Sequence, residues 1–376
     1  MSEAKTLGDH IKILSGFPFP STGFTSERNG QPIIRIRDLQ QQNPETYFTG
    51  DYDHEFLISK GDVLVGMDGD FNAIKWHGPP SLLNQRVCKI TTKDPEILDQ
   101  GFLYHSLQPQ LTRIHKGTAQ TTVKHLSTKD LYGIDAELPP LPEQKKIAEI
   151  LSGIDRVLIS LQLQERKIQI ARDEVIKSFF DEAVRSDGLA EIRSFGKIIT
   201  GSTPPTSNPL NYGDAVPFIS PGDINDGEIV LRTKSSLSES GATMSRILAP
   251  LSVCVVCIGS TIGKVALTAT ESATNQQINS ITQGSFDPYF MLAAMFYVKD
   301  KIRSAASTHA VPIINKSRFG EILIPNPSAD KQAKLGRFIE SSLKTLSFVN
   351  LHVQKYQNLK QALMADLLSG RKRVSV

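Results

Sequence analysis

The chain has 376 residues, of which 39% are hydrophobic and 22% are charged, and its formal net charge is +3. This length allows two or three domains, and the weak positive charge means that any affinity for nucleic acid must come from local patches. Three cysteines argue against a disulfide framework. Because no apolar run is long enough to span a bilayer, we expect a cytoplasmic protein.

Residues 1–138 have a mixed pattern that is rich in turns. Short apolar alternations predict three strands, at Pro32–Ile36, Asp62–Gly66 and Arg86–Thr91. Gly101–Ile114 has the pattern of a helix, and Ser127 is placed to cap a turn with Asp130. This region is therefore expected to form a mixed α/β domain.

A long helical pattern then occupies Leu138–Phe180, after a proline-rich lead-in at Leu138–Pro142. Its apolar residues recur mostly at alternating steps of three and four, at Ile147, Leu151, Ile154, Leu158, Leu161, Ile168, Val175 and Phe179. This is the 3.5-residue period of a coiled-coil seam, although Glu165 and Arg172 weaken it. Forty helical residues span roughly 60 Å, so another element must cover the apolar stripe.

Residues 186–327 repeat the parts of the first region in the same order. Asp223 follows a predicted strand as Asp38 does, and Asn275-Gln276 matches Asn84-Gln85, a pair that enters a strand. Val253–Gly259 likewise matches Val63–Gly69. The nearly constant spacing of these matches indicates two copies of one fold with loop insertions.

The C-terminal segment Asp330–Ser369 carries a second apolar stripe, at Leu335, Ile339, Leu346, Val349, Val353, Tyr356, Leu363 and Leu367. Gly370 supplies a helix stop, and a basic tail, Arg371–Arg373, follows it. Two such narrow stripes most simply pair with each other. The alternative is that each helix packs on its own neighbouring domain.

The sequence thus predicts an α+β chain with two similar mixed α/β domains, separated by two long antiparallel helices that form a coiled coil. The expected boundaries are a first domain at 1–138, a central helix at 139–185, a second domain at 186–327, and a C-terminal helix and tail at 328–376. Two copies in tandem suit a ligand with two separated halves. DNA with a split site is one candidate, and another extended or twofold partner is the alternative.

Enzyme motifs are weak throughout the sequence. None of the Pro-Pro pairs belongs to the Asp- or Asn-Pro-Pro-aromatic motif of amino methylation. The segment Gly259–Lys264 is one residue short of a phosphate loop and lacks the following Ser or Thr, so we interpret it as a turn between strands. Cys254 and Cys257 have CxxC spacing, but an alternating strand would place their sulfurs on opposite faces. We interpret them as core residues, and expect no bound metal.

The chain resembles the specificity subunit of type I restriction–modification systems over essentially its whole length. The segments that carry this resemblance are LPPLPEQKKIAEILSGID (138–155), IPNPSADKQ (324–332), LMADLLSGRKR (363–373), GDVLVGMDG (61–69) with NQR (84–86), and VCVVCIGSTIGKVAL (253–267) with NQQ (275–277).

The resemblance implies a non-catalytic subunit with two target recognition domains, one for each half of a bipartite DNA target, and helical spacers that set the gap. It also implies a complex with modification subunits, which bind S-adenosylmethionine and methylate adenine, and with restriction subunits that translocate and cut. S-adenosylmethionine, ATP and Mg are accordingly expected in the partner subunits, and none of them in this chain.

Candidate DNA contacts are polar or basic residues on expected loops, because Arg, Lys, Asn and Gln read base edges and Lys, Arg, Ser and Thr bind phosphates. Arg35 and Arg37 are expected to project from one strand face, and Asp68 and Trp76 to belong to a polar, aromatic loop. The candidates in the first domain are Arg35, Arg37, Asp68, Asn72, Lys75, Trp76, Lys116, Gln120, Lys124 and His125. Those in the second domain are Ser202, Thr203, Ser220, Ser260, Thr261, Lys264, His309, Asn315 and Lys316.

Two other classes of function stay open at this point. One is a protein–protein scaffold with two adhesive domains on a coiled-coil rod, which the nearly neutral net charge would suit. The other is an enzyme whose site has no recognisable motif.

Overall fold

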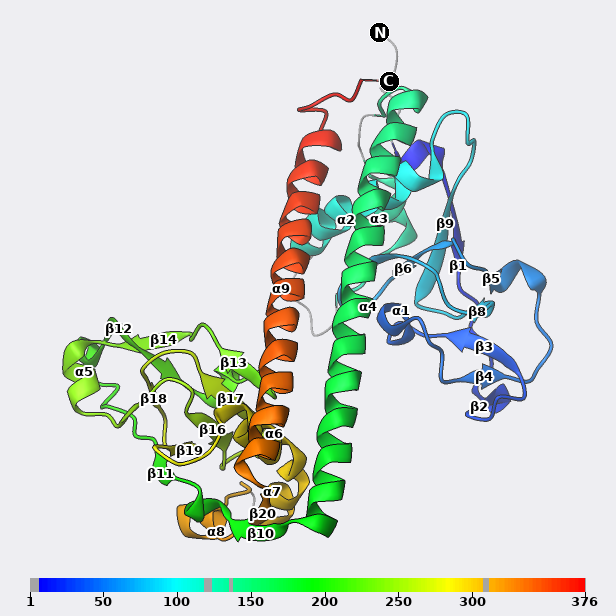
Figure 1. The fold of residues 1–376 in the computed structure, drawn as a ribbon. Coiled ribbons are helices and arrows are strands. Elements are labelled where there is room, and N and C mark those ends of the chain that lie inside the picture. The colour runs from blue at the N-terminus through cyan, green and yellow to red at the C-terminus, as the bar shows by residue number, and fades with distance from the viewer. Residues whose placement is uncertain (1–6, 118–123, 135–137, 307–310, 376) are drawn as a thin grey trace. The chain divides into compact units, whose positions relative to one another are not determined.

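The computed structural model describes residues 7–117, 124–134, 138–306 and 311–375. It divides into two compact units: unit 1 contains Met1–Ser160 and Gln354–Val376, and unit 2 contains Leu161–Val353. Helices α4 (Leu141–Ser186) and α9 (Ala329–Leu367) each contribute residues to both units. Figure 1 labels the elements of each unit.

Unit 1 contains two sheets. The first has the order β1 (Ile11–Ser15), β9 (Val87–Thr92), β6 (Val63–Gly66) and β7 (Ala73–Lys75), with antiparallel neighbours. The second has the order β2 (Phe24–Thr25), β4 (Tyr47–Phe48), β3 (Gln31–Ile34), β8 (Ser81–Leu83) and β5 (Leu57–Ile58). In this second sheet β3 and β8 are parallel, with Ile34 beside Leu83. The helices besides α4 and α9 are α1 (Asp38–Gln41), α2 (Gln100–Gly117) and α3 (Thr128–Tyr132).

The period-two alternation of β6 explains how the layers of unit 1 are joined. Val63 and Val65 pack with α2 and with the first turns of α4, through residues such as Leu107 and Ile147. Leu64 points to the other face and packs with the second sheet. The first sheet therefore lies between a helical layer and the second sheet, and both of its faces are buried.

Unit 2 repeats this plan. Its first sheet has the order β11 (Lys197–Thr200), β19 (Ile278–Thr282), β16 (Val253–Val256), β17 (Val265–Thr268) and β13 (Glu228–Val230). Its second has the order β14 (Ser235–Leu237), β12 (Tyr212–Ile219), β18 (Ser272–Thr274) and β15 (Ile247–Leu248). A separate pair joins β10 (Gly188–Glu191) to β20 (Leu323–Asn326). The other helices are α5 (Glu239–Thr243), α6 (Pro288–Tyr297), α7 (Lys299–Ala305) and α8 (Lys316–Gly320).

The predicted duplication is confirmed by matching strands in the two units. β12 and β18 are parallel, as β3 and β8 are, and Ile219 lies beside Thr274 as Ile34 lies beside Leu83. Along β16, Val253 and Val255 face the helical layer, while Cys254 and Val256 face the second sheet. The two units are thus two similar mixed α/β domains. Single-turn 3-10 helices occur at Gly8–His10, Ser21–Gly23, His54–Phe56, Ile192–Ser194, Pro209–Asn211 and Pro221–Asp223.

The two long helices are confirmed, with 46 residues in α4 and 39 in α9. In the second half of α4 the predicted seam holds in part. Ile168 and Phe179 are partly buried against the core of unit 2, but Val175 is 39% exposed, and the buried positions are Arg172, Ile176, Phe180 and Ala183. A helix of 3.6 residues per turn drifts away from a strict 3.5-residue repeat, so the covered stripe moves around its surface. In α9, buried Leu343 fills the gap that the predicted stripe left at Ser342.

The two helices pack together antiparallel within each unit (Figure 1). In unit 1, Asp155 Oδ1 lies 2.5 Å from Lys360 Nζ, and Glu143 lies beside Arg373. In unit 2, Ile176 and Phe180 share a core cluster with Leu335, Ile339, Leu343 and Leu346 of α9. Helix pairing is therefore confirmed, and both helices also pack into the core of each unit. No helix in the described part of the chain is both long and apolar enough to cross a membrane.

Candidate nucleic-acid interface

Three segments of unit 1 meet at the end of β6, and we call this place junction 1. They are the loop 67–72, the turn 84–86 and the stretch 124–127 before α3. The Met67 amide donates to the Arg86 carbonyl at 2.8 Å, and the Leu126 amide donates to the Met67 carbonyl at 2.7 Å. Gly69 then donates to the Lys124 carbonyl at 2.9 Å, with a φ of 72° that favours glycine.

Unit 2 contains the same arrangement at the end of β16, which we call junction 2. Cys257 donates to the Gln277 carbonyl at 2.8 Å, and Ile314 donates to the Cys257 carbonyl at 2.9 Å. Gly259, with a φ of 101°, donates to the Pro312 carbonyl at 3.0 Å. The two units therefore present loops from one shared backbone framework.

Charged side chains gather at junction 1. Nδ1 of His125 lies 2.6 Å from Oδ1 of Asp68, and Nη1 of Arg86 lies 3.4 Å from the same carboxylate. Lys124 Nζ donates to the His115 carbonyl at 2.5 Å. The structure thus brings together three predicted residues, Asp68, Lys124 and His125. It adds Arg86, whose only sequence signal was its position in the NQR segment.

The other candidates of unit 1 are spread more widely. Lys75 is exposed at the end of β7, and Lys116 is exposed in the last turn of α2. Asn72 is half-buried, and its Oδ1 lies 3.5 Å from Gln108 Nε2. Gln120 lies outside the described residues. A role in DNA binding stays a prediction for all four.

The interpretation of Trp76 as an exposed loop aromatic is wrong. Its side chain is fully buried in a cluster with Ile34 and Leu64, and its Nε1 donates to the Pro79 carbonyl at 2.9 Å. The indole is therefore covered on its faces and satisfied at its only donor. The polar residues that surround Trp76 in the sequence favoured an exposed loop, so its burial was not predicted.

The expectation that Arg35 and Arg37 share a strand face is also wrong. β3 ends at Ile34, because the Asp38 carboxylate accepts the Arg35 amide at 2.9 Å and turns the chain into α1. Arg35 is half-buried and its guanidinium donates to the Thr46 hydroxyl. Arg37 is exposed, 3.8 Å from Asp38.

In unit 2, the loop between β16 and β17 holds Ser260, Thr261 and Lys264. The loop is a turn, as predicted, with Gly259 and Gly263 in the left-handed region. Ser260 is exposed, whereas Lys264 is half-buried with Nζ 3.4 Å from the Ile224 carbonyl. Lys264 is therefore restrained by the loop 220–227.

Several other candidates of unit 2 have local structural roles. Ser220 forms a capping box with Asp223, and Asn315 caps α8 by accepting the Arg318 amide at 2.9 Å. Thr203 Oγ1 lies 2.5 Å from Gln276 Oε1, and the neighbouring Ser202 is half-buried. Lys316 is exposed, and His309 lies outside the described residues.

The cysteines are core residues, as predicted. Cys254 and Cys257 pack on opposite sides of the first sheet. Burial raises the pKa of Cys254 to about 11 and that of Cys257 to about 12, so both are neutral thiols at pH 7. Within the described ranges, no group of three or more His, Cys, Asp or Glu side chains is arranged to hold a metal ion.

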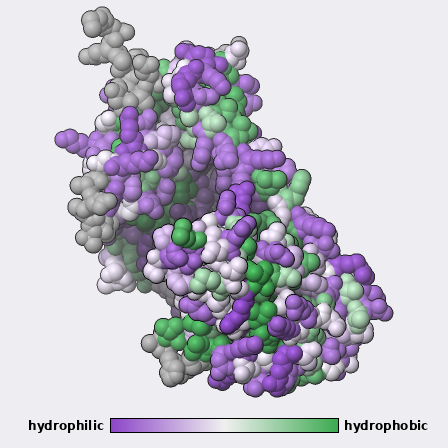
Figure 2. Space-filling view, turned by 90° about the vertical axis from the view of Figure 1, so that its left-hand side faces the viewer, coloured by the Kyte–Doolittle hydropathy of each residue, from purple (hydrophilic) through white to green (hydrophobic). Residues whose placement is uncertain are grey.

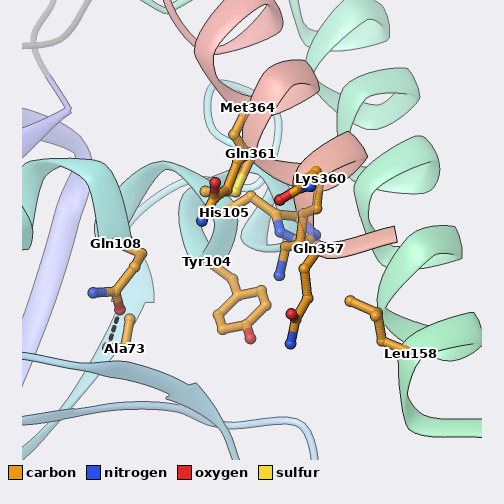
Figure 3. Close-up of a pocket in the computed structure, with 10 residues that line it drawn as sticks. Ala73, Tyr104, His105, Gln108, Leu158, Gln357, Lys360, Gln361 and Met364 are labelled. Carbon is orange, nitrogen blue, oxygen red and sulfur yellow. Dashed lines mark hydrogen bonds between the residues drawn. The ribbon is translucent and has the colours of Figure 1, made fainter. Parts of the chain in front are cut away.

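A cavity of about 560 Å³ lies in unit 1 between α2, α4, α9 and β7 (Figure 3). Its polar lining consists mainly of amide side chains and Lys360, and Gln108 also accepts the Ala73 amide at 3.0 Å. His105 lines it from α2 but is only 2% exposed. These groups offer hydrogen bonds, and none of the predicted contact residues lines the cavity.

The chain is similar to several proteins of known type. It is 28% identical to the type I restriction enzyme EcoBI specificity subunit of Escherichia coli, over 95% of this chain and 83% of that protein. It is 24% identical to the putative type I restriction enzyme MjaX specificity subunit of Methanocaldococcus jannaschii, over 99% of this chain and 94% of that protein. The solved S subunit of a type I restriction-modification system from M. genitalium has the same fold, with a TM-score of 0.66, 18% identity, and 96% and 95% of the two chains covered.

The family model described as "type I restriction modification DNA specificity domain" matches residues 2–172 and again residues 189–361. These two matches include both junctions and most of both long helices. The chain therefore belongs to the family of type I restriction–modification DNA specificity subunits.

Proposed function

We propose that this specificity subunit, which directs a type I restriction–modification complex to its DNA target, reads that target in two halves. Residues 1–138 and 186–327 are the two target recognition domains. The helical segments 139–185 and 328–376 are the spacers that set the gap between the halves. The subunit itself is non-catalytic, so its contribution is the choice of DNA sequence.

The observation that carries this proposal is the duplication. The family model matches the chain twice, and the same three backbone hydrogen bonds build junction 1 and junction 2. A shared framework with different side chains suits two domains that bind alike but read different bases. The candidate contacts at or near the junctions are Asp68, Lys116, Lys124, His125, Ser260, Thr261, Lys264 and Lys316.

The proposed partners are modification subunits and restriction subunits in addition to double-stranded DNA. Apolar side chains reach the surface of the long helices: Leu163, Ile170 and Phe348 of unit 2 are 54%, 60% and 63% exposed. Figure 2 shows a largely hydrophilic face on which apolar side chains gather in patches. We propose that modification subunits cover the helix faces, and that they supply S-adenosylmethionine while restriction subunits use ATP and Mg. The complex would act in the cytoplasm, where the DNA is.

Methylome sequencing tests this function. A host that carries the complex should show a split adenine-methylated motif, and deletion of this chain should abolish it. The isolated complex should also bind that motif in a gel shift that survives competitor DNA. Methylation that persists without the chain, or a continuous motif instead of a split one, would contradict the proposal.

A further inference from the structure

Junctions 1 and 2 share their backbone but differ in side chains at three equivalent positions. Asp68, Arg86 and His125 of junction 1 correspond to Ile258, Gln277 and Ile313 of junction 2, as the matched hydrogen bonds and the bridges Asp68–His125 and Ile258–Ile313 define. A carboxylate, a guanidinium and an imidazole thus stand where the second copy has two isoleucines and an amide. Two copies that read different half-sites must differ where they touch the bases, and these positions combine a constant framework with changed chemistry.

Arg86 is the member of this trio that is best placed to reach a ligand. Its side chain is 57% exposed, although its backbone is tied to Met67 at the centre of the junction. Its φ is 74°, in the left-handed region that arginine rarely adopts. Such strain persists only where the surroundings hold it, and it is typical of functional sites.

Asp68 orients this arginine. One carboxylate faces two cations or donors, with His125 Nδ1 at 2.6 Å and Arg86 Nη1 at 3.4 Å. Because the carboxylate contact uses only Nη1, further N–H groups of the planar guanidinium stay available to a ligand. Asp68 therefore orients the Arg86 side chain and leaves part of its guanidinium available to bind a ligand.

We propose that Arg86 reads a guanine in the half-site bound by unit 1, with Asp68 as its positioning residue. The guanidinium donates two N–H groups to O6 and N7 at the major-groove edge, a pairing that other base pairs do not offer. This inference rests on the proposed function and adds the residue and the base class. Junction 2 has Gln277 at the position of Arg86, and Ile313, 42% exposed, at the position of His125.

The test compares the intact complex carrying the unaltered chain with complexes carrying Arg86→Lys and Arg86→Gln. The methylated motif is mapped for each, and binding is measured on duplexes that differ at single base pairs. We expect both variants to relax one G·C position in one half-site, with about a tenfold to hundredfold loss of preference there. The other half-site should be read as before, which also shows that the variant chain is folded. Asp68→Asn should relax the same position less.

A DNA-side probe keeps the test independent of folding. Replacing the relevant guanine by 7-deazaguanine removes N7, and should weaken binding by the unaltered complex but cause no further loss with Arg86→Gln. Arg113→Gln, an exposed arginine of unit 1, is the matched control and should leave the motif unchanged.

Three outcomes would overturn the inference while the proposed function stands. The first is a split motif that neither Arg86 variant changes, and the second is a half-site without guanine on either strand. The third is uniformly weaker binding with a shallower salt dependence, which marks a phosphate contact. Absence of a split motif with the unaltered chain would overturn the proposed function itself.

Discussion

At the scale of single residues, buried polar side chains explain features that the apolar pattern does not. The Asp38 and Asp223 carboxylates accept the amides of Arg35 and Ser220 at 2.9 Å each, so one turn is built twice. Arg172 is buried on the apolar stripe of α4, where its Nη1 donates to the Gly227 carbonyl at 3.2 Å. Arg172, which weakens the coiled-coil seam, therefore links α4 to a turn of unit 2.

His105 makes the stability of unit 1 depend on pH. Burial lowers its pKa to about 4, despite the opposing charge of Asp155, and its Nε2 lies 3.0 Å from Ser152 Oγ. In the unfolded chain histidine titrates near 6.5, so on acidification the unfolded state takes up the proton first. The contribution of neutral His105 to the free energy of unfolding is fully present above about pH 6.5. It is lost as the pH falls toward 4, by about 1.4 kcal/mol per pH unit at most.

The measurement is urea unfolding of unit 1 at pH 7.5, 6.0 and 5.0. His105→Asn should flatten the pH dependence, whereas His54→Asn, at an exposed position, should keep the slope of the unaltered chain. An equal slope in all three proteins would contradict the assignment to His105.

At the scale of elements, the start of α4 is held by one glutamine. The Gln144 side chain, 1% exposed, accepts the Asp99 amide at 2.9 Å and donates to the carbonyls of Ile97 and Pro139 at 2.9 and 2.8 Å. In the second copy, Gln332 donates to the Pro327 carbonyl at 3.0 Å. The Pro-to-Gln spacing shared by the two copies is therefore a device that anchors a long helix to its domain.

Gln144→Ala should lower the free energy of unfolding of unit 1 by about 2 to 4 kcal/mol, because three partly buried backbone groups lose their partner. Lys145→Ala, at an exposed position of the same helix in unit 1, should change it by less than about 0.5 kcal/mol. Chemical denaturation of the two variants gives the comparison. Equal midpoints would show that the anchoring bonds contribute nothing measurable.

At the scale of the whole molecule, α4 and α9 are continuous across the boundary between the units. A continuous helix transmits any added length as a fixed rise of 1.5 Å per residue. The length of the two helices should therefore set the gap between the half-sites and leave the recognition of the bases unchanged.

Four residues inserted after Gln162 of α4, with four matching residues after Val353 of α9, should change the spacer of the methylated motif by one or two base pairs, because they add about 6 Å. Both half-sites should stay the same, and methylome sequencing reads both quantities together. The insertion in α4 alone is the control, and should weaken binding by mismatching the paired helices. A changed half-site with an unchanged gap would refute the spacer role.

The sequence alone determined the duplication, the two long helices and the family. These features rest on local signals, such as apolar period, proline and glycine punctuation, and turn residues, which neighbouring positions in the chain express directly. Tertiary structure decided which residues share a site: Asp68 meets Arg86 and His125 only because β6, the turn after β8 and the segment before α3 converge. It also decided that Trp76 is core, since burial depends on contacts with distant segments that no short stretch of sequence contains. Arg35, in contrast, leaves its strand through a local turn that Asp38 closes three residues later.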